Sequence, residues 1–231
     1  MNSDAIGTLY VVATPIGNRD DITYRAEKIL KSVATILCED TRTSKKLLEK
    51  YEIQTPLISY HAHSGVSKSN KIIELLKEGK DLALITDAGT PAISDPGVLL
   101  VAQIREAFGE NAKVVTIPGP SAVVAALSIS GIPSSEYTFL GFLPHKKGRE
   151  TLFTEIQAMK RTAVFYESPH RILKTLESLN EKIADTRTVV VARELTKIYE
   201  QIVSGTPKYV LEYFTNHPDK VRGEFVVIVS A

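Results

Sequence analysis

The sequence predicts an α/β protein with two α/β domains: the N-terminal sheet mostly parallel, the C-terminal sheet mixed or antiparallel. In the first half, short apolar runs alternate with amphipathic segments, a pattern typical of βαβ units. In the second half, apolar runs follow one another with fewer helical segments between them, which favours antiparallel pairing. The composition agrees, because 43% hydrophobic and 24% charged residues are typical of a globular chain.

The first half is expected to hold the parallel sheet. Its strands are expected at 9–13, 34–38, 57–60, 82–85 and 113–117. Four helices are expected between these strands. The first runs from an N-cap at Asp20 or Asp21 to Lys31, and the second follows Arg42 with Leu47 and Leu48 facing inward. The other two are expected over 67–77 and over 98–107. The run at 82–85 carries no charge on either face, as expected of a strand buried on both sides.

The second half starts after a turn near residue 118, so the domains are expected to be 1–118 and 119–231. Pro120 and Ser121 suit the start of a helix that runs to residue 130. Ser168 suits the N-cap of a second helix, with Pro169 at its first position. A short helix is expected over 207–214, and strands are expected at 138–143, 162–166, 188–192, 200–203 and 224–229.

The loop 86–97 follows the buried strand 82–85 and reads Thr-Asp-Ala-Gly-Thr-Pro-Ala-Ile-Ser-Asp-Pro-Gly. Open α/β sheets hold ligands at the carboxyl ends of their strands, where this loop is expected to lie. Gly89 and Gly97 allow a close approach to the backbone, and Asp87 can accept hydrogen bonds from a ligand. An ordinary connecting loop rich in turn residues explains the same pattern equally well.

Similar polar clusters follow several other expected strands. If these strand ends face one another, they line one cleft at the domain interface, a favoured place for a small-molecule site. The clusters are 14–18, 39–42, 87–97, 119–122, 167–171 and 193–197.

Several classes of site and location are not supported. The motifs G-x-G-x-x-G, G-x-x-x-x-G-K-[ST] and G-x-S-x-G are absent, which argues against common dinucleotide, P-loop and hydrolase sites. His61 and His63 lack neighbouring ligands at matched spacing, so no metal is expected. His170 suits a structural role better than that of a base. One cysteine, Cys38, and no long apolar run or signal-peptide pattern fit a cytoplasmic protein without membrane partners.

Six segments together carry a resemblance to a known family. In this combination and order they closely resemble the tetrapyrrole methylase family, and within it the enzymes that methylate ribosomal RNA. The resemblance spans nearly the whole chain. The segments are ATPIGN at 13–18, CEDTR at 38–42, TDAGTPAISDPG at 86–97, PGPSA at 118–122, FYESPHR at 165–171 and RELTK at 193–197.

The resemblance implies a homodimer that binds S-adenosylmethionine in a cleft between its two domains. It also implies 2′-O-methylation of a cytidine in 16S ribosomal RNA near the decoding site of the small ribosomal subunit. Carried over by motif position, the residues expected to contact the cofactor are Pro15, Asp87, Thr90, Ile93, Ser121 and Ala122, with Phe165, Tyr166, Ala192 and Glu224 as weaker candidates.

Methylation of a ribose hydroxyl calls for in-line positioning and for a group that helps to remove the proton. The candidates are Glu39, Asp40, Glu167, Glu194 and Lys197, each of which is equally explained as an ion-pair partner. RNA phosphates need cations, and the net charge of +1 means that these must be clustered. The candidate RNA contacts are Arg19, Arg42, Lys45, Lys146, Lys147 and Arg149.

Two other functions remain open at this stage. Relatives in the same family methylate tetrapyrroles or a modified histidine, so a cofactor pocket alone does not identify the substrate. The absence of Trp and the scarcity of aromatic residues count against a large flat macrocycle. A non-catalytic module that binds the cofactor and contacts RNA is the third possibility.

Overall fold

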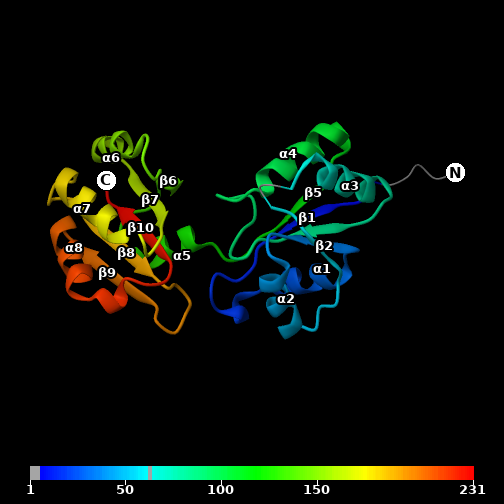
Figure 1. The fold of residues 1–231 in the computed structure, drawn as a ribbon, viewed down its shortest axis with the longest axis horizontal. Coiled ribbons are helices and arrows are strands. Elements are labelled where there is room, and N and C mark those ends of the chain that lie inside the picture. The colour runs from blue at the N-terminus through cyan, green and yellow to red at the C-terminus, as the bar shows by residue number, and fades with distance from the viewer. Residues whose placement is uncertain (1–5, 62–63) are drawn as a thin grey trace. The chain divides into compact units, whose positions relative to one another are not determined.

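The computed structural model describes residues 6–61 and 64–231 and divides into two compact units. The first unit is Met1–Ser121 and the second is Ala122–Ala231. The division lies a few residues beyond the boundary expected from the sequence. Both units combine helices with one five-stranded sheet (Figure 1), and the two-domain α/β class expected from the sequence is confirmed.

The sheet of the first unit is entirely parallel. Its strands lie in the order β3-β2-β4-β1-β5. The expectation of a parallel sheet is confirmed, and β4, which precedes the loop 86–97, lies at the centre. Because all five strands are parallel, their carboxyl ends meet at one edge. The strands are β1 (Leu9–Val12), β2 (Thr35–Cys38), β3 (Leu57–Ser59), β4 (Leu82–Leu84) and β5 (Val114–Ile117).

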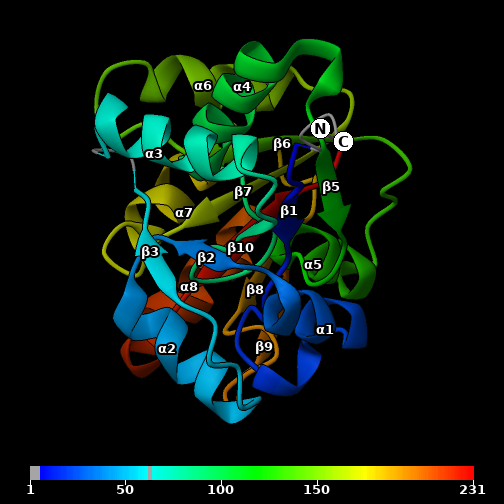
Figure 2. The same cartoon turned by 90° about the vertical axis from the view of Figure 1, so that its right-hand side faces the viewer.

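Helices cover both faces of this sheet. Ala26, Leu30 and Leu48 pack with one set of strand residues, and Ile72, Leu76 and Leu100 pack with the other. Thus α1 and α2 cover one face and α3 and α4 the opposite face, as Figures 1 and 2 show for this unit. Both faces of β4 are therefore buried. The helices are α1 (Tyr24–Ser32), α2 (Thr41–Lys50), α3 (Val66–Lys77) and α4 (Gly97–Phe108).

The start of α1 differs from the sequence expectation. Asp20 and Asp21 belong to a separate 3-10 helix, η1 (Arg19–Asp21), and neither caps α1. The cap is Thr23, whose hydroxyl oxygen accepts a hydrogen bond from the Ala26 amide at 3.1 Å. Thr is a favourable N-cap because its side chain satisfies an amide that the helix leaves free.

The sheet of the second unit is mixed, with strands in the order β6-β7-β10-β8-β9. The edge strand β6 runs parallel to β7, and the other neighbouring pairs are antiparallel. The mixed sheet expected from the sequence is thereby confirmed. The strands are β6 (Tyr137–Phe142), β7 (Thr162–Glu167), β8 (Val189–Arg193), β9 (Gln201–Gly205) and β10 (Phe225–Val229).

The two faces of this sheet have different partners. Phe165 belongs to the main core, where Phe153, Leu176 and Phe214 pack against one face. The next residue along the strand, Tyr166, points the other way, and its hydroxyl accepts from the Val123 amide of α5. So α6, α7 and α8 cover one face and α5 the other. The helices are α5 (Ala122–Ser130), α6 (Arg149–Ala158), α7 (Ile172–Lys182) and α8 (Pro207–Asn216).

Two helices of this unit differ from the expectation. Helix α6 occupies a stretch in which no helix was expected, and it provides the parallel crossover between β6 and β7. Helix α7 begins at Ile172 and not at Pro169. Ser168 starts a turn instead, because its carbonyl accepts from the amides of Arg171 and Ile172 at 3.1 and 3.0 Å.

Candidate functional site

The loop after β1 and the loop after β4 are joined through their backbones. The Thr14 amide donates to the Gly89 carbonyl at 2.9 Å, and the Gly89 amide donates back at 3.1 Å. The buried Thr14 hydroxyl adds a bond of 3.0 Å to the Thr86 carbonyl. These contacts hold together the two loops that carry Pro15 and Asp87, two of the residues expected to contact a cofactor.

The loop after β5 is joined to the same group. The Thr90 hydroxyl donates to the Pro120 carbonyl at 3.2 Å. A Cβ built on Gly119 would lie 3.0 Å from the Ala13 Cβ, so the loop after β5 also passes close to the end of β1. The structure therefore brings Pro15, Thr90 and Ser121 to three loops that are in mutual contact. Ile93 lies on the middle loop with 51% of its surface exposed.

The loop 86–97 holds an unusual backbone. Ala92 and Ser94 have φ of 67° and 58°, in the left-handed region that L-residues seldom adopt. Such conformations cost roughly 1–3 kcal/mol each and persist where neighbouring contacts enforce them. Gly97 is also required, because a Cβ there would lie 2.9 Å from Asp95 Oδ1 and 2.9 Å from Leu84 Cδ2. The chain is thus held tightly at the start of α4.

Carboxylates from two strand ends meet beside this loop. The Thr86 hydroxyl donates to Glu39 Oε1 at 3.2 Å, and the Asp95 carboxyl contacts that of Glu39. Partial burial, followed by the nearby Asp95 carboxylate, raises the pKa of Glu39 to about 7. Partial burial also raises the pKa of Asp87, against the effect of the Asp40 amide that donates to it. Glu39 can therefore exchange a proton near neutral pH.

The pKa of Asp40 is shifted in the opposite direction, although Asp40 follows Glu39 directly in the sequence. Arg42 Nη2 and Nε reach its two carboxylate oxygens at 2.8 and 3.2 Å, and the Arg42 amide donates at 2.8 Å. These hydrogen bonds lower the pKa of Asp40 to about 2. Asp40 thus remains ionised, as expected of the N-cap of α2. The Arg42 side chain is 88% exposed, although its guanidinium is paired.

In the second unit, the candidate cofactor residues on the sheet lie on two different faces. Tyr166 pairs with Val226, which pairs with Ala192, so these residues form one row on the α5 face. Phe139 and Phe142 pack against the Tyr166 ring, with centroids at 5.0 and 5.3 Å. The Phe165 side chain is fully buried on the opposite face. Only the backbone of Phe165 is therefore available to a ligand.

Glu167 is enclosed in a network of buried cations. Its side chain has no exposed surface, and its oxygens lie 2.7 Å from Arg171 Nη2 and 3.9 Å from Arg149 Nη1. The Thr175 hydroxyl donates to it at 2.6 Å and accepts from Arg149 at 2.7 Å. A carboxylate with these partners is suited to hold the structure together. Arg149 is only 5% exposed, so its predicted contact with RNA phosphate does not fit this environment.

Glu194, Lys197 and Glu224 form a second ionic group, at the end of β8 and the start of β10. Lys197 Nζ lies 2.7 Å from Glu194 and 2.9 Å from Glu224. Burial acts to raise the pKa of Glu194, but Lys197 outweighs it and lowers that pKa. Burial acts to lower the pKa of Lys197, but its two carboxylate partners raise it. Both groups are held charged, which makes either one a poor base at neutral pH.

The remaining candidate cations for RNA are on the surface. Arg19, Lys146 and Lys147 are exposed, and the Lys45 side chain is 71% exposed beside Glu49 at 3.8 Å. Lys146 and Lys147 lie on the loop between β6 and α6. Exposed cations of this kind can contact phosphate without a change of fold.

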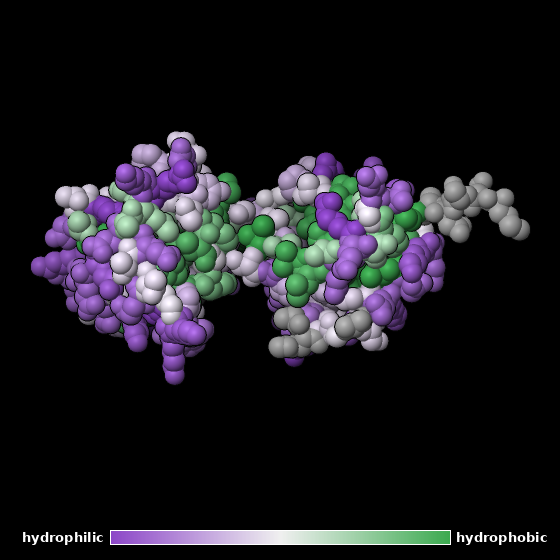
Figure 3. Space-filling view, turned by 90° about the horizontal axis from the view of Figure 1, so that it is seen from above, coloured by the Kyte–Doolittle hydropathy of each residue, from purple (hydrophilic) through white to green (hydrophobic). Residues whose placement is uncertain are grey.

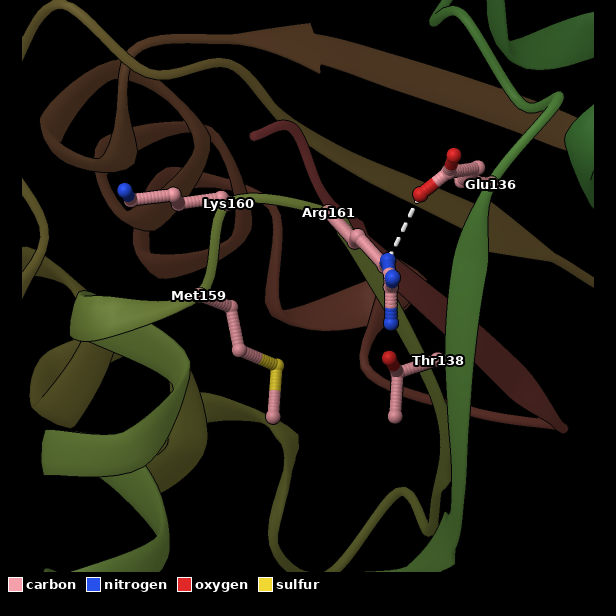
Figure 4. Close-up of a pocket in the computed structure, with 5 residues that line it drawn as sticks. All are labelled: Glu136, Thr138, Met159, Lys160 and Arg161. Atoms are coloured by element: carbon pink, nitrogen blue, oxygen red, sulfur yellow. Dashed lines mark hydrogen bonds and ion pairs between the residues drawn. The ribbon is translucent and has the colours of Figure 1, made fainter.

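A separate pocket of about 340 Å³ lies in the second unit (Figure 4). Its lining includes Glu136 and Arg161, which are paired at 2.6 Å and precede β6 and β7. The pocket is therefore at the amino ends of these parallel strands, away from Tyr166 and Glu167 at the carboxyl end of β7. It contains none of the expected site residues, and Figure 4 shows the side chains that line it, with the Glu136–Arg161 pair marked.

The described parts of the chain hold no cluster of metal ligands and no membrane-spanning helix. No group of three or more His, Cys, Asp or Glu there could hold a metal ion. His61 is described, whereas His63 lies outside the described residues. Over the same residues, no helix has both the length and the apolar character needed to cross a membrane.

Asp95 and Thr86 are residues of this region to which the sequence assigned no role. Thr86 links the carboxyl group of Glu39 to β4, and Asp95 accepts from the Gly97 amide at the start of α4. The one available signal was an Asp placed two residues before a helix, where Asx side chains often satisfy free amides. The contact between Asp95 and Glu39 joins residues far apart in the chain and has no local signature.

A family model and individual relatives both match the chain over most of its length. The family model of Tetrapyrrole (Corrin/Porphyrin) Methylases matches residues 8–209. The chain is 46% identical to a ribosomal RNA small subunit methyltransferase I from Xylella fastidiosa, over 97% of this chain and 81% of that protein. It is 43% identical to the protein of the same name from Thermotoga maritima, over 97% of this chain and 99% of that protein.

Solved structures show the same fold at lower identity. A cobalt precorrin-4 methyltransferase superposes with a TM-score of 0.69 and 20% identity, over 100% of this chain and 97% of that chain. A uroporphyrin-III C-methyltransferase from Thermus thermophilus gives 0.65 and 18%, over 97% of this chain and 94% of that chain. These likenesses support the fold of the present chain.

Proposed function

Because the chain belongs to the family of tetrapyrrole (corrin/porphyrin) methylases, we propose that it transfers a methyl group to a cytidine 2′-hydroxyl of 16S ribosomal RNA near the decoding site. Members of this family use S-adenosylmethionine as methyl donor, and the chain is a methyltransferase of this kind. The observation that carries the choice of RNA is the identity of 43–46% to relatives named ribosomal RNA small subunit methyltransferase I.

The three joined loops of the first unit suit the methyl donor. Asp87 offers an exposed carboxylate and Ile93 an exposed apolar side chain. A nucleoside with an amino acid tail needs this combination of acceptor and apolar surface. In the second unit, Tyr166, Ala192 and Glu224 are proposed as further contacts, together with the backbone of Phe165. Ser121 and Ala122 connect the two sets along the chain.

Methyl transfer depends mainly on how the protein positions the methyl donor and the ribose oxygen. When bound, the sulfonium donor supplies an activated methyl group, and the protein has to align it with a ribose oxygen. The chain can also help to remove the hydroxyl proton. Asp40, Glu194 and Lys197 are held charged by their partners, and Glu167 is fully buried among cations. Glu39 is the candidate whose pKa lies near neutrality, and its role is developed below.

The RNA surface is proposed to use cations of both units. Arg19, Arg42 and Lys45 lie beside the loops of the first unit, and Lys146 and Lys147 lie on an exposed loop of the second. Phosphate contacts of this type provide affinity, and access to the 2′-hydroxyl distinguishes RNA from DNA. Arg149 is left out of this surface because it is buried.

The proposed assembly is a homodimer. Apolar side chains are exposed on the first unit, including Val98 and Leu99 of α4 at 53% and 55%. Figure 3 views the side that carries α3 and α4 and shows apolar surface on that unit. A second copy of the chain is the proposed partner for such surface. Sedimentation at several concentrations measures this, and a monomer at micromolar concentration would contradict it.

The function is tested with labelled methyl donor and 30S subunits from a strain that lacks this modification. We expect label in the 16S RNA, recovered after digestion as 2′-O-methylcytidine. An absence of label in the RNA, with donor binding intact by calorimetry, would contradict the proposal. Label on the base of the nucleoside would contradict the ribose assignment. Transfer to a tetrapyrrole but not to RNA would move the chain to the other branch of its family.

A further inference from the structure

A pair of carboxyl groups joins the loop 86–97 to the end of β2. Asp95 uses one oxygen, Oδ1, to accept from the Gly97 amide at the first residue of α4. Its other oxygen, Oδ2, is buried and has no hydrogen-bond partner among the described residues. The Glu39 carboxyl contacts Asp95, and Glu39 Oε1 accepts from the Thr86 hydroxyl at 3.2 Å.

Two ionised carboxylates in contact would repel, and the oxygens that face one another would both be acceptors. One proton between them removes both problems, because a protonated Glu39 can donate to Asp95, whose Oδ2 lacks a partner among the described residues. Burial and the Asp95 carboxylate raise the pKa of Glu39 to about 7, in agreement with this arrangement. The charged groups nearby are Asp87 on the same loop and Asp40 at the start of α2. Asp40 is ionised and forms an ion pair with Arg42.

The contact is placed where it can control the loop. Between Thr86 and Asp95 the chain passes through Ala92 and Ser94, both with positive φ. Such strain has to be opposed by contacts at the ends of the segment. Asp95 supplies two of them, one to the start of α4 and one to Glu39. The middle of the segment carries Thr90 and Ile93, which are proposed contacts of the methyl donor.

We propose that Asp95 is a positioning residue for binding of the methyl donor, and that one proton shared between Asp95 and Glu39 holds the loop 86–97 in its binding form. The inference rests on the proposed location of the donor site at this loop. It assigns Glu39 to the loop and not to proton removal from the ribose. The pair stabilises the loop when Glu39 is protonated, so its contribution is complete at low pH and is lost as the pH rises from about 4.5 through about 7.

The decisive variant is Glu39→Gln. Its amide always donates to Asp95, and its carbonyl oxygen still accepts from Thr86, so it reproduces the protonated state at every pH. The dissociation constant of S-adenosylmethionine is measured by calorimetry between pH 5.5 and 8. For the unmodified protein we expect it to increase about fivefold more than for Glu39→Gln over this range. Titration of the ligand itself is common to both proteins and cancels in the comparison.

Two further variants complete the test. Asp95→Ala removes both contacts and is expected to weaken donor binding about tenfold at pH 6, with kcat at saturating donor largely retained. Glu106→Gln removes an exposed carboxylate of α4 and is the matched control, with the pH dependence of the unmodified protein. If Asp95→Ala fails to fold, the pH comparison with Glu39→Gln still decides the question.

Three results would overturn the inference. Glu39→Gln could keep the pH dependence of the unmodified protein, or it could bind the donor normally and lose kcat, as expected if Glu39 is the base. Asp95→Ala could fold and bind the donor with unchanged affinity. Asp87→Ala separates this inference from the proposed function. If Asp87→Ala weakens donor binding while Asp95→Ala does not, only the pair is wrong; if Asp87→Ala also has no effect, the donor site itself is misplaced.

Discussion

Glu39 and Glu167 both lie at the carboxyl end of a strand, but their surroundings give them different properties. Glu167 faces Arg171 and Arg149 and has no exposed surface. Glu39 is partly exposed and faces another carboxyl group, that of Asp95. The carboxyl of Glu39, beside a carboxylate, takes up a proton more readily than an isolated one, and its pKa is raised to about 7. Glutamate thus has a structural role at position 167 in the second unit, whereas at position 39 in the first unit it can change its protonation state near neutral pH.

The Glu167 network leads to a prediction about stability. Glu167→Ala leaves Arg149 and Arg171 without their buried partner and is expected to lower the free energy of unfolding by about 3–5 kcal/mol. Urea unfolding followed by circular dichroism measures it. The control is Glu136→Ala, in a pair whose side chains are 64% and 71% exposed, where a loss below about 1 kcal/mol is expected. Equal losses in the two variants would contradict the structural role of Glu167.

Charge reversal at exposed lysines tests the RNA surface. Lys146→Glu with Lys147→Glu is expected to weaken binding to 30S subunits about tenfold or more at low salt and to reduce the salt dependence. Donor affinity should not change, because neither lysine is a proposed donor contact. Lys113→Glu is the charge-matched control, since Lys113 is exposed and precedes β5 at the amino edge of the first sheet. Equal weakening in the control would indicate a non-specific effect of charge.

At the scale of elements, the apolar runs predicted the strands well and the helix starts less well. Strand β4 is buried along its whole length and carries no charge, so its pattern does not depend on context. The cap of α1 was expected at Asp20 or Asp21, but Thr23 is the residue that accepts from a helix amide. Helix α6 was missed because it buries a charged residue, Arg149, which requires the distant partner Glu167. An ion-pair partner in a distant segment cannot be predicted from the local sequence.

The cap of α8 gives a prediction for a single element. The Thr206 hydroxyl oxygen accepts from the Tyr209 amide at 3.2 Å, with Pro207 at the first position of the helix. Thr206→Ala removes this acceptor and is expected to cost about 1 kcal/mol of unfolding free energy. Thr206→Ser keeps the hydroxyl and should recover most of that loss. Thermal unfolding of the two variants provides the comparison, and equal melting temperatures would contradict the assigned cap.

For the whole molecule, each unit carries its own core. The main core of the second unit draws its residues from 143–229, and α5 covers the other face of the same sheet. A fragment of residues 122–231 is therefore expected to fold alone and to unfold cooperatively in urea. A matched fragment of residues 143–231 lacks α5 and β6 and should be much less stable. A fragment 122–231 without a cooperative transition would show that its core depends on the first unit.

The candidate site was predictable only in part at this scale. Motif order placed Asp87, Thr90 and Ser121 near one another, and the joined loops of the first unit agree with that placement. A strand at 162–166 puts Phe165 and Tyr166 on opposite sides of the sheet, but the sequence could not show which side holds the main core, because both residues are apolar and the strand is buried on both faces. It also could not distinguish exposed Lys147 from buried Arg149, since burial of a charge depends on a partner elsewhere in the chain.

The reciprocal amide-to-carbonyl contacts between Thr14 and Gly89 have a consequence for mutational tolerance. Backbone amide and carbonyl groups do not depend on the side chain, so most substitutions at Pro15 or Ala88 should leave these two hydrogen bonds intact. Gly89 is the exception, with φ of 83° and with Ile16 Cγ2 3.3 Å from where a Cβ would be. In a saturation library, position 89 should therefore tolerate replacement less than the adjacent position 88.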